Sequence, residues 1–178
     1  MMERKAKTVT FRLYEDIIDK LEREAKNREI SLNKFASQIF KNFLDWDMLQ
    51  AKAGMIPIAK LVIVEIFEKM TKEEVEDLAK RVGKDTVQNI ILFMEKDLTL
   101  ASILSWIEAW IKKNSTAGFT STKKNGIQTY IMKHDLGENW SLYHKTILVQ
   151  IFKEVLNEPI TIDTRGSTLR FSFKNHGS

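Results

Sequence analysis

Three polar side chains recur at every second position near the start of the chain: Thr8, Thr10 and Arg12. A threonine hydroxyl both donates and accepts hydrogen bonds, and the arginine guanidinium is a planar fork of five donors. Threonine hydroxyls beside an arginine guanidinium can together recognise hydrogen-bond donors and acceptors on a partner molecule. For this, one secondary-structure element must place the three side chains on the same face.

The residues between them predict that element. Val9, Phe11 and Leu13 alternate with the polar set, and alternation at period two is typical of a half-buried β-strand. A helical pattern starts at Tyr14, so this strand has no partner nearby in its own chain, and a lone strand leaves its backbone groups unpaired. We expect the same strand of a second copy to complete a two-stranded antiparallel ribbon. A ribbon of this width fits the major groove of DNA.

Two helices are predicted directly after the strand. Apolar residues recur at helical spacing over residues 17–25, with acidic residues near the helix start, where the helix dipole favours them. Ser31 is placed as the N-cap of the second helix. The apolar stripe of this second helix is Leu32, Phe35, Ala36, Ile39, Phe40 and Phe43.

With its TVTFRL strand, YEDII helix start and SLNK cap, the stretch 7–44 resembles the ribbon-helix-helix superfamily, the fold of the methionine and Arc repressors. The resemblance implies a homodimer on double-stranded DNA, with Thr8, Thr10 and Arg12 as the base-reading residues. It also implies a phosphate held by backbone amides at the start of the second helix. The residues of that phosphate site are Ser31, Leu32, Asn33 and Lys34.

Two positions depart from the family pattern. The family often has Gly in the turn between the helices, where this chain has Glu29, and Ser, Thr, Asp or Pro at the helix start, where it has Tyr14. Each departure removes a favourable local contribution of roughly 1 kcal/mol. The alternative interpretation is an ordinary edge strand that leads into a helical hairpin.

Basic residues are concentrated at the start of the chain. The whole chain has a formal charge of +4, and residues 1–44 hold ten Lys or Arg against seven Asp or Glu. Arg4, Lys5 and Lys7 precede the strand with only Glu3 opposing them, which predicts an arm that contacts DNA phosphates. The alternative is a solvated terminus.

Composition narrows the remaining chemistry. The chain has 178 residues and no Cys, which excludes disulfides, thiolate metal sites and cysteine nucleophiles and favours a cytoplasmic protein. No signal peptide, membrane-spanning run or Gly-rich phosphate loop is recognisable. No catalytic constellation is present either, so we expect a protein that is not an enzyme and needs no cofactor.

The second half predicts helices followed by strand, strand, helix, strand, strand. A helix starting at Pro57 and apolar almost all round to Phe67 is expected at the centre of this half. Capping signals at Thr71, Asp85 and Thr99 predict three more helices, with Gly83 ending the first of them. Asn125-Gly126 predicts one hairpin and Arg165-Gly166 a second, with a long helix between them that starts near residues 139–141. The fold class is therefore α+β, with an antiparallel sheet covered on one face by helices.

The densest polar cluster in the second half is the stretch 134–141. His134, Trp140 and Ser141 form a candidate effector loop for a small molecule or a partner, and the alternative is a capping loop with an aromatic plug. The spacing of the three histidines does not match a metal site, so no metal is expected. Trp106 and Trp110 lie on an amphipathic pattern and are expected in the core.

Together these features predict a ribbon-helix-helix domain over residues 1–50 and an α+β sensing or assembly domain over 55–178. The predicted function is a sequence-specific transcriptional regulator, a homodimer or tetramer that binds double-stranded DNA, with a small-molecule or protein effector and no membrane. The alternative is an antitoxin-type protein whose C-terminal half binds a partner protein. Neither the operator, the effector nor the choice between repressor and activator follows from the residues.

Overall fold

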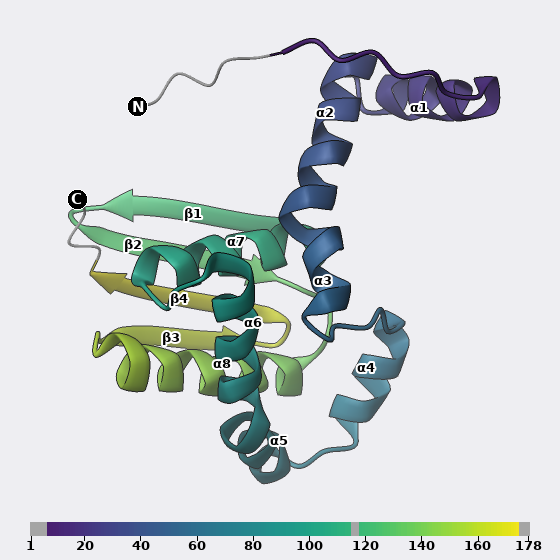
Figure 1. Cartoon of the computed structure of the whole chain (residues 1–178). Coiled ribbons are helices and arrows are strands. Elements are labelled where there is room, and N and C mark those ends of the chain that lie inside the picture. Colours follow the sequence, from purple (N-terminus) through teal and green to yellow (C-terminus); the bar gives the residue numbers. More distant parts are fainter. Residues whose placement is uncertain (1–6, 115–117, 175–178) are drawn as a thin grey trace. The chain divides into compact units, whose positions relative to one another are not determined.

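The computed structural model describes residues 7–114 and 118–174. The chain divides into two compact units, Met1–Met48 and Leu49–Ser178, and each is described by itself. Figure 1 shows the helices of the first unit in purple and blue, and the helices and strands of the second in teal to yellow.

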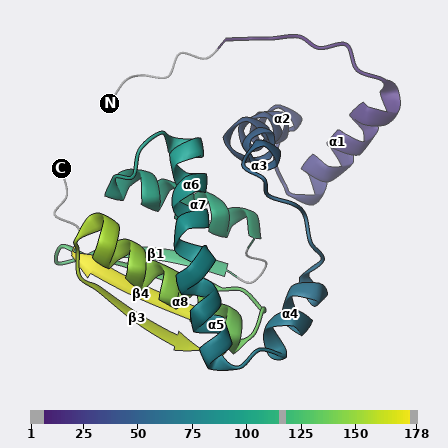
Figure 2. The same ribbon diagram turned by 60° about the horizontal axis from the view of Figure 1, so that its bottom comes forward.

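The first unit starts with an extended segment and a helix. Residues 7–14 form a drawn-out segment that is neither helix nor strand (Figure 2), and the backbone of Tyr14 at its end is extended. No strand in the described part of the chain pairs with this extended segment, so the predicted β-strand is not formed in the single chain. Helix α1 (Glu15–Asn27) follows at once, with the extended residue Tyr14 as its N-cap and Glu15 and Asp16 in its first turn. The Tyr14 side chain makes no capping bond, but its carbonyl oxygen accepts from the backbone N–H groups of Ile17 and Ile18. The helix therefore begins where the sequence predicts, without a side-chain cap.

The turn after α1 is a complete Schellman motif. The Ile30 N–H donates to the Ala25 carbonyl and the Glu29 N–H donates to the Lys26 carbonyl, at 3.0 Å each. Glu29 has a φ of 54°, in the left-handed region that favours glycine. A glutamate thus adopts at this turn the backbone conformation that glycine adopts most readily.

Helix α2 (Leu32–Asn42) begins at the predicted cap. The Ser31 Oγ accepts from the Lys34 N–H at 3.2 Å. The helical chain continues past Leu44 through the π-helical segment η1 (Phe43–Asp47) and α3 (Met48–Lys52) towards Gly54.

The second unit contains the remaining helices and the sheet. Its elements are α4 (Lys60–Glu68), α5 (Lys72–Leu78), η2 (Ala79–Gly83), α6 (Lys84–Glu95), α7 (Leu100–Asn114), β1 (Gly118–Lys124), β2 (Ile127–Lys133), α8 (Glu138–Gln150), η3 (Ile151–Leu156), β3 (Ile160–Arg165) and β4 (Thr168–Lys174). The strands form one antiparallel sheet in the order β1-β2-β4-β3, and helices α6, α7 and α8 lie on the same side of it (Figures 1 and 2). The α+β prediction is confirmed.

The core lies between the sheet and these helices. On the two central strands, β2 and β4, the residues whose side chains point towards the helices are buried, whereas their neighbours along the strands are more exposed. The buried residues of the sheet are Gln128, Tyr130, Met132, Leu169, Phe171 and Phe173. Those of the helices include Val75, Ala79, Ile91, Ile103, Trp106, Ile107, Ile147, Ile151 and Phe152.

Local signals placed most element ends correctly. Thr71 makes a full capping box with Glu74, and the Thr99 Oγ1 accepts from the Ser102 N–H. Asn125 and Gly126 both have positive φ, as a tight two-residue hairpin requires. The second hairpin turns at residues 166–167, one residue later than predicted.

The prediction of a central helix at Pro57 is wrong. Helix α4 begins at Lys60, and Pro57 lies in the segment before it. Phe67 is the buried residue of α4, whereas Leu61 is 76% exposed and Ile66 is 51% exposed. An apolar composition by itself does not determine which neighbour covers a helix.

Gly83 does not end a helix, and Asp85 does not start one after a break. Residues 72–95 form consecutive helical segments, with Gly83 as the last residue of η2. A Cβ at Gly83 would lie 2.6 Å from Cδ1 of the buried Ile147. This glycine therefore permits close packing of the helices.

Candidate nucleic-acid interface

The extended segment at the start of the first unit exposes both of its faces. Thr8, Thr10 and Arg12 are exposed, as predicted for groups that contact a partner. On the other face Val9 is 66% exposed and Phe11 is 58% exposed. The Phe11 ring packs partly on Phe40 of α2, with ring centroids 5.3 Å apart, so the apolar face is directed towards the helices but is incompletely covered.

The first unit buries little apolar surface in the single chain. Its buried apolar residues among those described are Ala25, Phe35 and Trp46. Its exposed large apolar residues are Val9, Phe11, Leu13, Tyr14, Ile17, Ile39, Phe40, Phe43, Leu44 and Met48. A unit of this size needs a larger apolar core, because it otherwise buries too little surface to offset the entropy of folding. The exposed set is therefore expected to meet further protein surface.

At the capped start of α2, two backbone N–H groups have no acceptor within the helix. The cap uses the Lys34 N–H, and an α-helix provides no internal acceptor for the earlier amides of Leu32 and Asn33. These amides carry the positive end of the helix dipole, and the exposed side chain of Lys34 lies next to them in the chain. The four residues predicted to hold a phosphate are therefore together at one helix end.

Acidic and basic residues of the first unit lie on different secondary-structure elements. Residues 7–14 and 30–44 contain no Asp or Glu, whereas α1 carries five carboxylates at positions 15, 16, 19, 22 and 24. The extended segment and α2 are therefore purely basic in formal charge. Arg4 and Lys5, also predicted to contact phosphates, lie outside the described residues. Lys7 is described and exposed.

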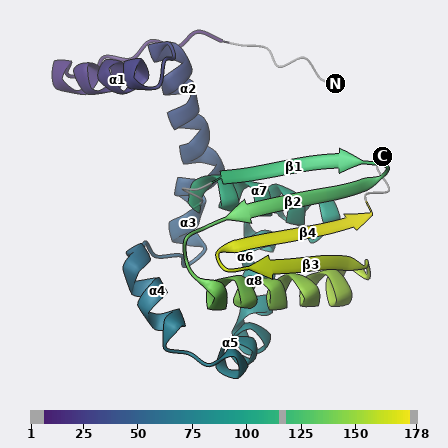
Figure 3. The ribbon, with the colours of Figure 1, turned by 180° about the vertical axis from the view of Figure 1, so that it is seen from behind.

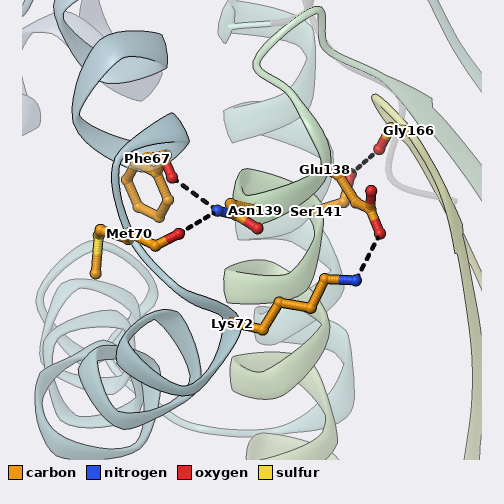
Figure 4. A network of polar contacts seen from close by, with 7 residues as sticks. All are labelled: Phe67, Met70, Lys72, Glu138, Asn139, Ser141 and Gly166. Atoms are coloured by element: carbon orange, nitrogen blue, oxygen red, sulfur yellow. Dashed lines mark hydrogen bonds and ion pairs between the residues drawn. The ribbon is translucent and has the colours of Figure 1, made fainter.

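His134 and Ser141, from the candidate effector loop, bond to each other inside the second unit. The Leu136 N–H donates to Nδ1 of His134 at 3.0 Å, so the neutral ring carries its proton on Nε2. This Nε2 lies 2.8 Å from Ser141 Oγ. The Ser141 Oγ in turn donates to the Gly166 carbonyl at 2.7 Å (Figure 4). Both residues are at least 97% buried, and burial lowers the pKa of His134 to about 4.

Trp140 completes the arrangement as an aromatic plug. Its ring centroid lies 4.8 Å from that of Phe67 and 4.6 Å from that of His144. The network links the end of β2, the start of α8 and the β3–β4 turn. This arrangement favours the capping-loop alternative for residues 134–141, and the effector loop stays a prediction.

Asn139 is a further structural residue that the sequence did not reveal. Its Nδ2 donates to the carbonyl oxygens of Phe67 and Met70, at 2.8 Å each (Figure 4). One side chain thereby ties the end of α4 to the start of α8. An amide side chain in the first turn of a helix was the available signal, but its acceptors lie about 70 residues away in the chain.

Other kinds of site find little support. Within residues 7–114 and 118–174, no group of His, Asp and Glu side chains is placed to hold a metal ion. In the same ranges, no helix combines the length and the apolar character needed to cross a bilayer.

Comparison with known proteins assigns the chain to no family. No family model matches the chain, and no curated protein does. The interface is therefore interpreted from its own geometry and charge.

Proposed function

We propose that this protein is a sequence-specific DNA-binding regulator that acts as a homodimer. Residues 8–13 of two copies pair as an antiparallel ribbon and enter the major groove with Thr8, Thr10 and Arg12 towards the bases. The observation that carries the proposal is an extended, unpaired segment with alternating faces, on a unit that lacks a core of its own. A second copy supplies both the missing strand and the missing apolar surface.

The remaining contacts follow from charge and helix geometry. The backbone N–H groups of Leu32 and Asn33 donate hydrogen bonds to a DNA phosphate at the start of α2, with Lys34 adding charge beside it. Lys7, with Arg4 and Lys5 before it, contacts phosphates along the backbone. The absence of carboxylates from the extended segment and α2 supports this assignment, because a carboxylate there would repel the phosphate backbone.

Selection of bound fragments from genomic DNA, followed by titration of the recovered sequence, tests the proposal. Arg12→Ala should relax preference at particular base pairs and cost about 1–3 kcal/mol for each lost contact. Lys7→Ala is the matched control, because it should weaken binding to all sequences alike and reduce the salt dependence. Unchanged sequence preference in the Arg12→Ala variant would exclude the ribbon as the recognition element.

The second unit contributes assembly or effector sensing in this proposal. It has a core of its own, and a ribbon-helix-helix dimer does not require it for folding. Deletion of residues 55–178 should leave a module that binds the same sequence more weakly, because contacts between subunits are lost. Equal affinity and stoichiometry for both proteins, with no response to cell metabolites in either, would contradict this role.

A second candidate function is favoured by one observation. The apolar side chains of Ile56, Ile58, Leu61 and Ile66 are exposed around α4, as expected of a surface that binds a partner protein in an antitoxin-type complex. In that case Leu61→Ser would abolish a stoichiometric complex with a second polypeptide and leave DNA affinity unchanged. Native mass measurement of the co-expressed proteins distinguishes the two functions.

A further inference from the structure

The sheet of the second unit has one face that its helices leave open. In Figure 3 the strands lie nearest the viewer, with α6 and α7 behind them. Every strand position that points away from the helices is exposed or half-buried. These positions are Gly118, Thr120, Thr122 and Lys124 on β1; Ile127, Thr129, Ile131 and Lys133 on β2; Thr168, Arg170, Ser172 and Lys174 on β4; and Thr161, Asp163 and Arg165 on β3. We call these fifteen positions the open face.

The open face is strongly basic. It carries five cations, Lys124, Lys133, Arg165, Arg170 and Lys174. Asp163 is the one carboxylate among its fifteen positions, and it pairs in register with Arg170. The formal charge of this face is therefore +4, the same as that of the whole chain.

The strand register arranges these groups in rows across the sheet. One row consists entirely of hydroxyls, Thr122, Thr129, Ser172 and Thr161, because each of these residues pairs with the next across the strands. Lys124 and Lys174 lie beyond this row at one end of the strands, and Arg170, Lys133 and Arg165 lie beyond it at the other. Along a strand, four to six residues separate the two groups of cations, which corresponds to about 14–20 Å.

We infer that the open face is a second binding surface for the phosphate backbone of duplex DNA. Lys, Arg, Ser and Thr are among the side chains that bind phosphate oxygens. Two groups of cations about 14–20 Å apart match the two phosphate chains that border a major groove about 12 Å wide. The inference rests on the proposed function, since it takes duplex DNA as the ligand of the chain.

The directions of the side chains exclude the main competing occupants. Single-stranded nucleic acid binds to sheets through exposed aromatic rings, whereas Tyr130, Phe171 and Phe173 are buried on the opposite face. Insertion into a membrane surface needs a larger apolar area than Ile127 and Ile131 provide. A second copy docked by this face would bring like charges together across a two-fold axis, which disfavours a symmetric dimer.

The test uses the full-length chain with four cations of the open face replaced by glutamine. This sheet variant carries Lys124→Gln, Arg165→Gln, Arg170→Gln and Lys174→Gln. Fluorescence polarisation with a duplex of arbitrary sequence, at salt concentrations from about 50 to 200 mM, measures affinity and its salt slope. Loss of two to four phosphate contacts should weaken binding roughly 30- to 1000-fold at physiological salt and reduce the slope by about 2–4.

A matched control separates this surface from overall charge. The helix variant carries Lys69→Gln, Lys80→Gln, Arg81→Gln and Lys153→Gln, which are exposed positions on the helices of the same unit or, for Lys69, directly after one. It has the same change in charge and should keep most of the affinity and the salt slope. Equal unfolding midpoints of both variants and the wild type establish that the fold is intact.

The outcomes distinguish this inference from the proposed function. If the sheet variant binds duplex DNA as the helix variant does, while Arg12→Ala still loses sequence preference, the inference is overturned and the proposed function stands. If the wild type binds no duplex DNA, both are overturned. Tighter binding of the wild type to single strands or to anionic lipid vesicles, lost in the sheet variant, would assign the open face another occupant and overturn the inference.

Discussion

Truncation of Phe11 is the sharpest test of dimerisation through the ribbon. Its side chain is 58% exposed in the single chain and lies on the face that a second ribbon strand and its helices would cover. Taking about 200 Å² for a whole phenylalanine side chain, pairing would remove roughly 110 Å² from water on each protomer. At about 25 cal/mol per Å², this corresponds to about 3 kcal/mol per protomer and about 5 kcal/mol per dimer.

The Phe11→Ala variant should therefore dimerise roughly 10³- to 10⁴-fold more weakly than the wild type. Sedimentation equilibrium, with thermal unfolding followed over a hundredfold range of protein concentration, measures the effect. The wild-type midpoint should rise with concentration, because folding of the first unit is linked to association. The midpoint of the variant should be lower, and its dimer should dissociate at concentrations where the wild type remains associated.

Thr10→Ala is the matched control, since Thr10 is the neighbouring residue on the opposite face of the same segment. It should leave the dimerisation constant unchanged and weaken binding to the preferred DNA sequence. If Phe11→Ala dimerises like the wild type, or if the wild-type protein is a stable folded monomer at micromolar concentration, the ribbon interpretation is refuted.

Three further predictions concern stability and are measured by chemical denaturation. Burial lowers the pKa values of His134 and His144 to about 4, so below pH 6.5 the unfolded chain binds more protons than the folded one. The free energy of unfolding should therefore be constant above this pH and fall by up to roughly 3 kcal/mol per histidine towards pH 4. The His144→Phe variant should show a smaller fall, and a flat profile would contradict both assignments. Glu29→Gly should stabilise the first unit by about 1 kcal/mol, because glycine adopts the positive φ of this turn without strain; a destabilised variant would contradict the Schellman geometry. Gly83→Ala should destabilise the second unit by about 1–2 kcal/mol despite the higher helix propensity of alanine, because the added Cβ would clash with Ile147. Ile147→Val in the same chain should restore part of the lost stability. If the effects of the two changes are additive, the two residues do not share a contact.

The sequence by itself determined the features that depend on short-range interactions. Ser31, Thr71 and Thr99 each cap a helix through a hydrogen bond to an amide three residues away, so the residue type and its position are enough to predict the bond. Asn125-Gly126 makes its hairpin turn because both residues tolerate positive φ.

Only the tertiary structure decided which surfaces are covered. The apolar pattern of α4 suggested a central helix, but burial depends on neighbours distant in the chain, and Leu61 remains exposed. Gly83 resembles a helix stop until the position of Ile147 is known, because helix ends and close helix contacts favour the same residue. The polar stretch at 134–141 resembled a ligand site for a similar reason. The acceptor of Ser141 is the Gly166 carbonyl, 25 residues further along, and only the folded chain brings the two together.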